Sequence, residues 1–210
     1  MEDKKITPQE SMEIISEMIQ TTKRRMTMQD LKIFITWGLL AIGTALVVGT
    51  LLLLTHNKWF QLFWFLIPLV GVPCTLALSK KARKENKVKT FVDSLTNGIW
   101  KIVGYSGLGL MLLCVAFSLF GYHQLWISTF FFAFIIVGFG AAMQGVVVRE
   151  NSYVFGGLFS IVSGFFVMGL YLCNIPLSIT WCLPLYILCF LLMCIVPAGI
   201  VAKKIKRGQQ

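Results

Sequence analysis

Charged residues divide this chain into long apolar stretches and short polar connections. Six stretches contain no Lys, Arg, Asp or Glu, and they cover about residues 33–54, 60–78, 102–122, 126–147, 153–173 and 179–202. An α-helix of about 20 apolar residues crosses the hydrocarbon layer of a bilayer. The pattern therefore predicts an all-α fold, a polytopic membrane bundle of six transmembrane helices within residues 33–202.

Two segments outside these stretches also show helical periodicity. In the N-terminal segment 1–32, Thr7-Pro8-Gln9-Glu10 has the residues of a helix start, and apolar residues then recur at three- and four-residue steps as far as Met26. The same spacing continues from Val88 to Ile102. We expect an amphipathic helix in residues 1–32 and a second one at about 84–101, which runs directly into the third span.

The composition agrees with a membrane protein. Of the 210 residues, 57% are hydrophobic and only 13% are charged, far from the usage of an ordinary soluble domain. The connections between the six stretches are too short to hold a folded soluble domain. The bundle is therefore the one compact domain that the sequence predicts, preceded by segment 1–32 and followed by a basic tail at 203–210.

The basic residues fall almost entirely on one side of the predicted membrane. Alternation of six spans places segments 1–32, 79–101, 148–152 and 203–210 on the same side, and these hold 18 of the 19 basic residues, all except Lys58. The positive-inside rule assigns this side, with both termini, to the cytoplasm. The net charge of +10 then reports topology and attraction to anionic lipid headgroups, and we expect no nucleic-acid partner.

Two basic clusters are the candidate contacts with lipid headgroups or with a cytosolic protein partner. They precede the first and the third span and comprise Lys23, Arg24, Arg25, Lys80, Lys81, Arg83, Lys84, Lys87 and Lys89. In the alternative interpretation, the two amphipathic helices pack on each other or on a second subunit.

Small residues four positions apart mark candidate packing faces in three spans. These residues are Ala41, Ala45 and Gly49, then Gly138 and Ala142, then Gly156, Ser160 and Gly164. Such faces allow helix backbones to approach closely, which favours association where lipid tails give no hydrophobic driving force. The spacing is compatible with packing inside one bundle and with a homodimer.

Four prolines and one glutamine define an alternative, a path for a solute. Pro68 and Pro73 lie in the second span and Pro184 and Pro197 in the sixth, where a proline removes a backbone hydrogen bond and can kink the helix. Transporters use broken helices of this kind to line substrate sites. Gln144, a strongly polar side chain near the inner end of the fourth span, is expected to make an interhelical or interfacial hydrogen bond.

Cysteine and histidine provide little candidate chemistry. The six cysteines lie in or at the ends of spans without the spacing of a zinc site, so we expect free thiols and no metal, although Cys173 and Cys182 flank a loop and are able in principle to pair. A His-x-x-Trp pattern occurs at His56 and again at His123. We interpret both copies as interfacial anchors, with an outward-facing metal or proton site as the alternative.

No catalytic constellation or nucleotide-binding motif is present in the sequence. We therefore expect no enzymatic activity and no cofactor. The sequence favours an integral membrane protein that acts as an assembly, scaffold or signalling partner through its basic cytoplasmic helices. The alternative is a small transporter or channel for a neutral or apolar solute, which requires a cavity half-way along the spans.

The N-terminal sequence from Thr7 to Ile15, followed by Thr22-Lys23-Arg24 and by Trp37-Gly38, resembles that of small uncharacterised multispan proteins of bacterial inner membranes. The resemblance covers mainly the first 40 residues. It implies a location in the bacterial cytoplasmic membrane and brings no activity and no site residue with it.

Overall fold

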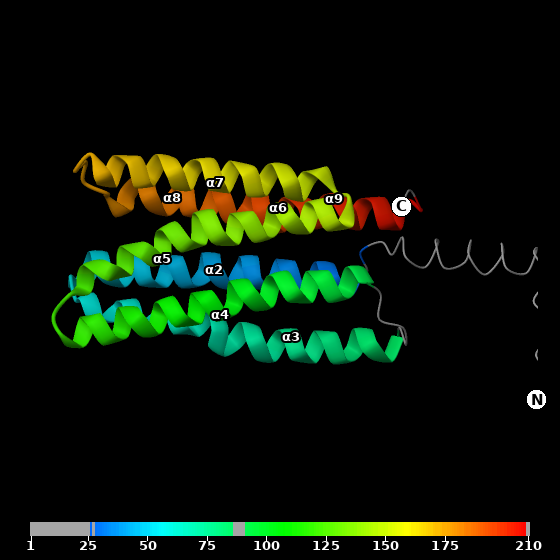
Figure 1. The fold of residues 1–210 in the computed structure, drawn as a ribbon, viewed down its shortest axis with the longest axis horizontal. Coiled ribbons are helices and arrows are strands. Elements are labelled where there is room, and N and C mark those ends of the chain that lie inside the picture. Colours follow the sequence, from blue (N-terminus) through cyan, green and yellow to red (C-terminus); the bar gives the residue numbers. More distant parts are fainter. Residues whose placement is uncertain (1–25, 27, 86–90, 209–210) are drawn as a thin grey trace, which may run out of the picture.

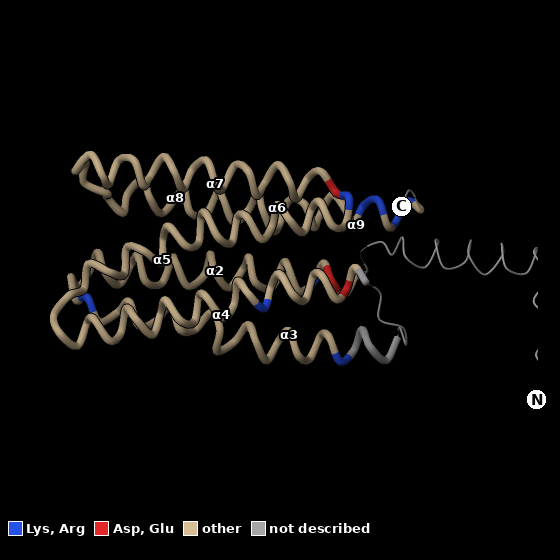
Figure 2. Tube along the Cα trace, viewed as in Figure 1, with Lys and Arg blue, Asp and Glu red and all other residues tan. Residues whose placement is uncertain are grey.

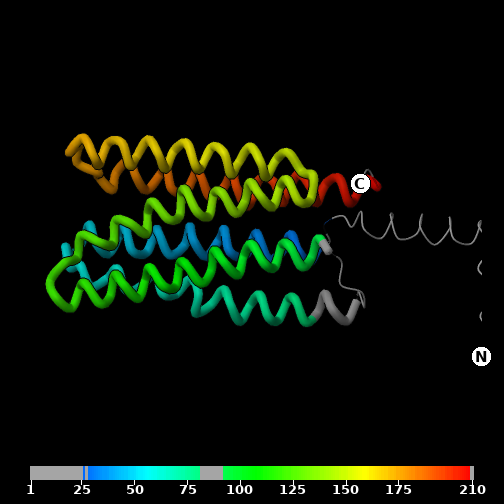
Figure 3. The backbone as a smooth tube through the Cα atoms, viewed as in Figure 1, coloured from blue at the N-terminus to red at the C-terminus, as the bar shows by residue number. Residues whose placement is uncertain are grey.

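A computed structural model describes residue 26 and residues 28–85 and 91–208 of the chain (Figure 1). Within this part, six helices are long and apolar enough to cross a membrane. The chain is thus a multi-pass membrane protein with the predicted all-α fold. The helices lie side by side along one axis, so that the first span begins and the last span ends at the same end of the bundle (Figure 3).

The first span is a regular helix, α2 (Met28–Thr55). The second span has a 3₁₀ segment, η1 (Lys58–Phe65), that leads into α3 (Leu66–Glu85), and the third span is α4 (Phe91–Leu119).

The last three spans contain both π-helical segments of the described chain. The fourth span joins η2 (His123–Trp126), α5 (Ile127–Phe131), the π-helical η3 (Phe132–Ile136) and α6 (Val137–Val148). The fifth span is α7 (Asn151–Leu172). The sixth joins α8 (Ile179–Phe190), the π-helical η4 (Leu191–Ile195) and α9 (Val196–Lys206).

Several helices are longer than the charge-free stretches that predicted them. At one end of the bundle, α4 begins at Phe91 and α9 continues to Lys206. At the other end, α4 stops at Leu119, three residues short of the predicted limit, because the chain turns at Gly121 with a φ of 88° that glycine adopts without strain. Of the predicted second amphipathic helix, residues 84 and 85 belong to α3 and residues 91–101 to α4.

Charged side chains gather toward the end of the bundle where α2 begins and α9 ends, which we call the charged end (Figure 2). Among the described residues, Lys58 is the one charged residue at the opposite end, which we call the Lys58 end. At the charged end, Lys204 Nζ lies 2.6 Å from Glu150 Oε2 and joins α9 to the start of α7. This distribution matches the segregation of charge expected from the sequence.

The order of packing differs from the order of the chain. Helix α3 packs on α2, α2 packs on α8 and η4, α7 packs on η4 and α6, and α6 packs on α4. Although α3 and α4 are consecutive, neither packs extensively on the other among the described residues. Helix α3 is therefore held mainly by α2, and α4 is held mainly by α6 and the start of the fourth span.

Half-way along the bundle, α7 lies against both π-helical segments. A Cβ atom placed at Gly156 would overlap the backbone of Leu192 in η4, and one at Gly164 would lie 2.7 Å from Phe134 Cβ in η3. Between them, Ser160 Oγ donates a hydrogen bond to the carbonyl oxygen of Phe134 at 2.9 Å. A π-turn interrupts the regular helical hydrogen-bond ladder, and the buried carbonyl there takes a donor from another helix.

Aromatic rings fill the interior on either side of this region. Toward the Lys58 end, the ring centroid of Tyr186 lies 4.6 Å from that of Phe190, 5.2 Å from Phe130 and 5.8 Å from Trp64. We call these four residues, with Phe134, the Tyr186 cluster. Toward the charged end, Phe34 packs between Trp100 and Tyr153.

Replacing Gly156 by alanine tests the contact between α7 and η4. The new methyl group has no space because the Leu192 backbone occupies its position. Overpacking of this kind costs about 1–3 kcal/mol, so we expect the midpoint of thermal unfolding in detergent to fall by about 2–8 °C. Gly169→Ala on the same helix is the matched control because no atom lies within 4 Å of its Cβ position. Equal melting temperatures for the two variants would contradict the packing described.

Candidate functional site

The predicted basic clusters fall only partly within the described residues. Lys80 is exposed near the end of α3, and the backbone of Lys81, Arg83 and Lys84 lies in the last turns of the same helix. The other predicted contacts, Lys23, Arg24, Arg25, Lys87 and Lys89, lie outside the described residues. The described part of this basic surface is therefore limited to the last turns of α3.

The predicted small residues lie at contacts between helices of the same chain. Ala41 and Ala45 are buried in α2, and a Cβ at Gly49 would lie 3.1 Å from the Leu183 side chain of α8.

The contact between α6 and α7 is made largely by small residues. A Cβ placed at Gly138 would lie 3.0 Å from Ser160 Cβ, and one at Gly157 would lie 2.8 Å from Ala142 Cβ. These residues, like Gly156 and Gly164, face other helices of the same chain and are buried in contacts within the bundle. A homodimer would therefore have to use another face.

The five predicted solute-path residues, Pro68, Pro73, Gln144, Pro184 and Pro197, are spread over four helices. Pro68 lies in the first turn of α3, directly after a 3₁₀ segment, and Pro73 and Pro184 lie inside α3 and α8. Pro197 is fully buried and is the second residue of α9, two positions after the end of η4. Since proline has no N–H and its ring crowds the preceding turn, the π-helical segment accommodates it without ending the span.

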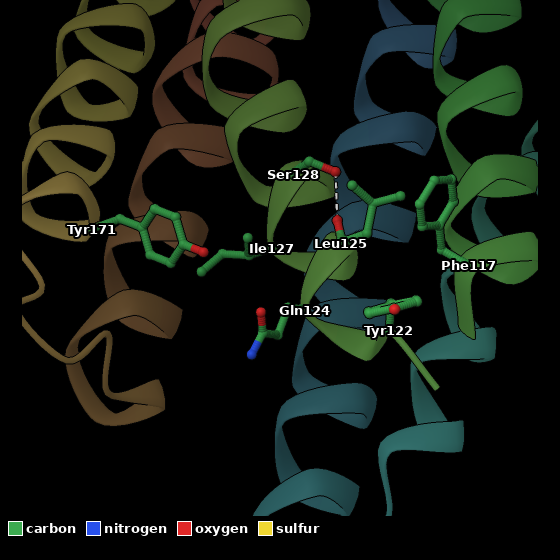
Figure 4. A pocket seen from close by; sticks show the side chains of 7 residues that line it. All are labelled: Phe117, Tyr122, Gln124, Leu125, Ile127, Ser128 and Tyr171. Carbon is green, nitrogen blue, oxygen red and sulfur yellow. Dashed lines mark hydrogen bonds between the residues drawn. The ribbon is translucent and has the colours of Figure 1, made fainter. Parts of the chain in front are cut away.

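A hollow of about 330 Å³ lies near the Lys58 end, between the end of α4, the segment from η2 to α5, and the end of α7 (Figure 4). It is lined by Phe117, Tyr122, Gln124, Leu125, Ile127, Ser128 and Tyr171, and by none of the solute-path residues. The hydroxyl of Ser128 donates to the Leu125 carbonyl at 2.5 Å. The remaining lining offers apolar contact with two phenols and one amide, so it suits an amphiphilic molecule and supplies no acid, base or nucleophile.

One side-chain hydrogen bond lies directly behind the residues that line this hollow. Trp126 is 3% exposed, and its Nε1 donates to Ser118 Oγ at 2.8 Å. The bond connects the end of α4 to η2 across the turn at Gly121 and so brings Phe117 and Leu125 to the same hollow. Sequence reasoning did not find the hollow because it depends on this contact between neighbouring spans.

The two His-x-x-Trp segments meet at the Lys58 end. The ring of Trp59 lies edge-on to that of His123, with centroids 5.5 Å apart. Among the described residues, no group of three or more His, Cys, Asp or Glu is placed to hold a metal ion. Cys173 and Cys182 are free thiols.

Sequence reasoning also missed a set of buried polar atoms toward the charged end. Within the described chain, five side-chain atoms are buried without a hydrogen-bond partner: Gln29 Oε1, Trp100 Nε1, Gln144 Oε1, Ser152 Oγ and Tyr153 OH. Gln144 was expected to make a hydrogen bond, and its carbonyl oxygen makes none within the chain. Only the position of Gln144 inside an apolar span gave a signal in the sequence.

No protein-family model, no curated protein and no solved structure matches this chain. Function therefore has to be inferred from the arrangement of its own residues.

Ser118→Ala tests the bond that forms the hollow. The change leaves the buried Trp126 N–H without an acceptor, which costs about 1–3 kcal/mol, so we expect a melting temperature lower by about 2–8 °C. Ser106→Ala in the same helix is the control, since the Ser106 hydroxyl is exposed and bonds only to backbone carbonyls of its own helix. If both variants have the melting temperature of the wild-type protein, the Ser118–Trp126 bond does not stabilise this end of the bundle.

Proposed function

We propose that this protein is a non-catalytic component of a bacterial cytoplasmic membrane that assembles with a partner through the exposed face of α4 and through its basic cytoplasmic segments. The proposal combines an orientation, with both termini in the cytoplasm, and a protein-binding surface within the membrane. The contrast between the outward faces of α4 and α7 carries it.

The distribution of charge supports the orientation. The charged end holds the described basic residues except Lys58. In the sequence, further basic residues stand before the first span and between the second and third spans. Insertion machinery retains such segments in the cytoplasm.

The outward face of α7 has the character of a lipid-facing surface. Its most exposed side chains are large and apolar, as at Phe155, Val162 and Phe166, which are 71%, 66% and 59% exposed. Exposure of such residues requires no protein partner in a membrane, because lipid tails are as apolar as the side chains.

The outward face of α4 also carries large apolar side chains, such as Ile102 and Leu112, but it has three open glycines where α7 has one, Gly169. Gly98, Gly104 and Gly109 each have open space around the position of a Cβ atom. Helical spacing places them on the same side as Asn97 and Lys101, both of which are exposed or half-exposed polar positions with room beside them. Glycine and polar side chains on one face are typical of contacts between transmembrane helices, since they allow close backbone approach and hydrogen bonding.

The alternative, transport of a neutral or apolar solute, has weaker support. The solute-path residues are spread over three spans, and the hollow at the Lys58 end includes none of them. The Tyr186 cluster also fills the interior where a path toward that end would run. These observations favour a packed bundle that acts through its surface.

Photocrosslinking in cells tests the α4 surface. Benzoylphenylalanine replaces Tyr105, which is 72% exposed on α4, and in a separate variant Phe166 on α7. We expect a protein adduct of defined mass from position 105 and only lipid adducts from position 166. A second copy of the chain and a different protein are distinguished by the mass of the adduct.

Glycine variants provide the matched test of the same surface. Gly109→Leu fills space that a partner helix would enter, at a cost of about 1–3 kcal/mol, so the yield of the position-105 adduct should fall about tenfold. Gly169→Leu on α7 adds the same side chain in equally open space and should leave the yield unchanged. Lipid adducts alone at both positions would refute partner binding through α4.

A further inference from the structure

We infer that Trp100, Gln144 and Tyr153 bind water inside the bundle, in a hydrated site near the charged end. The inference is independent of the partner proposed for α4, because it concerns side chains that face the interior. The ligand class follows from the burial, the hydrogen-bonding capacity and the surroundings of these three groups.

The three residues come from α4, α6 and α7, and two of them, Trp100 and Tyr153, meet at one ring. The ring centroid of Phe34 in α2 lies 5.4 Å from that of Trp100 and 5.2 Å from that of Tyr153. A Cβ placed at Gly140 would lie 3.7 Å from the Trp100 ring, and Gln144 follows Gly140 by one helical turn on the same side of α6. The indole and the phenol thus share the space next to Phe34, and Gln144 lies on α6, which packs on the helices of both.

Each group has a buried polar atom without a partner among the described residues. Gln144 is 2% exposed and Tyr153 is fully buried, and neither the Gln144 Oε1 atom nor the Tyr153 hydroxyl is hydrogen-bonded. The Nε1 atom of Trp100 is buried and equally unpartnered. A buried polar group without a hydrogen bond destabilises a fold, so nearly all such groups in native proteins have a protein or water partner.

Two other tryptophans show how this chain satisfies an indole when it uses its own residues. Trp37 Nε1 donates to Thr75 Oγ1 and Trp126 Nε1 donates to Ser118 Oγ, each at 2.8 Å. In both cases a neighbouring helix or segment supplies a hydroxyl. Among the described residues, no hydroxyl plays this part for Trp100, and we assign its partner to water.

Water matches the hydrogen-bonding capacity of the three groups. The indole donates, the glutamine carbonyl accepts, and the phenol does both, which is the set of partners that a buried water molecule needs. The aromatic rings around Phe34 are in contact with one another, so the site suits single water molecules better than a larger solute.

Two further unpartnered atoms lie between this site and the end of the bundle. Ser152 precedes Tyr153 in the first turn of α7, and Gln29 is in the first turn of α2. They extend the polar lining toward the charged end, from which water would enter. Toward the Lys58 end, the Tyr186 cluster closes the interior, so the hydrated site ends within the bundle.

Radiolytic labelling in water enriched with oxygen-18 tests the site, because radicals formed from a bound water oxidise the side chains beside it. Tyr186 is the internal control, since it is also buried, at 2% exposure, but lies among rings. We expect the labelling rate of Tyr153 to exceed that of Tyr186 by about fivefold or more, with the heavy oxygen incorporated. Equal rates for the two tyrosines would overturn the inference.

The melting temperature gives a second test, because a hydrated site and a dry site predict changes in opposite directions. Tyr153→Phe keeps the ring on Phe34 and removes only the hydroxyl. If water is bound, the variant loses a hydrogen bond and should melt about 2–6 °C below wild type. If the site is dry, removal of an unsatisfied hydroxyl raises the melting temperature, which would also overturn the inference. The matched control is Tyr171→Phe, because the phenol of Tyr171 lies in the open hollow. This variant should have the melting temperature of wild type.

Discussion

The bundle depends on the close approach of α7 to the backbones of two other spans. Lipid tails provide no hydrophobic driving force between helices, so close packing and interhelical hydrogen bonds have to hold the spans together. Small residues on α7 allow contact with the backbone at Leu192 and with Gly138 and Ala142 of α6. The hydrogen bond from Ser160 to the Phe134 carbonyl then fixes α7 against a π-helical segment. The other helices are arranged around this contact.

The arrangement explains why the outward surfaces differ. Since α7 uses its small residues inside the bundle, its large residues face outward, as suits contact with lipid. On α4, by contrast, Gly107 contacts Phe132 while Gly104 and Gly109 remain open. Buried polar groups half-way along the bundle and toward the Lys58 end, such as Ser160 and Trp126, bond to the chain itself, whereas the Trp100, Gln144 and Tyr153 atoms toward the charged end have no partner among the described residues.

The fold class follows from the sequence because it rests on a local property, the absence of charge over lengths that cross a membrane. The small residues at Gly138, Gly156 and Ser160 are similarly visible as a spacing. Features that need two spans to meet are not visible: the Ser118–Trp126 bond, the ring of Trp59 on His123, and the convergence of Trp100 and Tyr153 on Phe34. Of the two π-helical segments, only η4 has a local signal, the proline that follows it.

The most direct test of this account is a disulfide between α6 and α7. A Cβ at Gly138 would lie 3.0 Å from Ser160 Cβ, slightly closer than the separation in a disulfide, which is about 3.5–4.5 Å. The account predicts that Gly138→Cys combined with Ser160→Cys forms a disulfide on mild oxidation in membranes, detected by mass spectrometry of the linked peptides. Gly138→Cys combined with Gly169→Cys should not form one. Absence of the first disulfide, or equal yields from both pairs, would contradict the account.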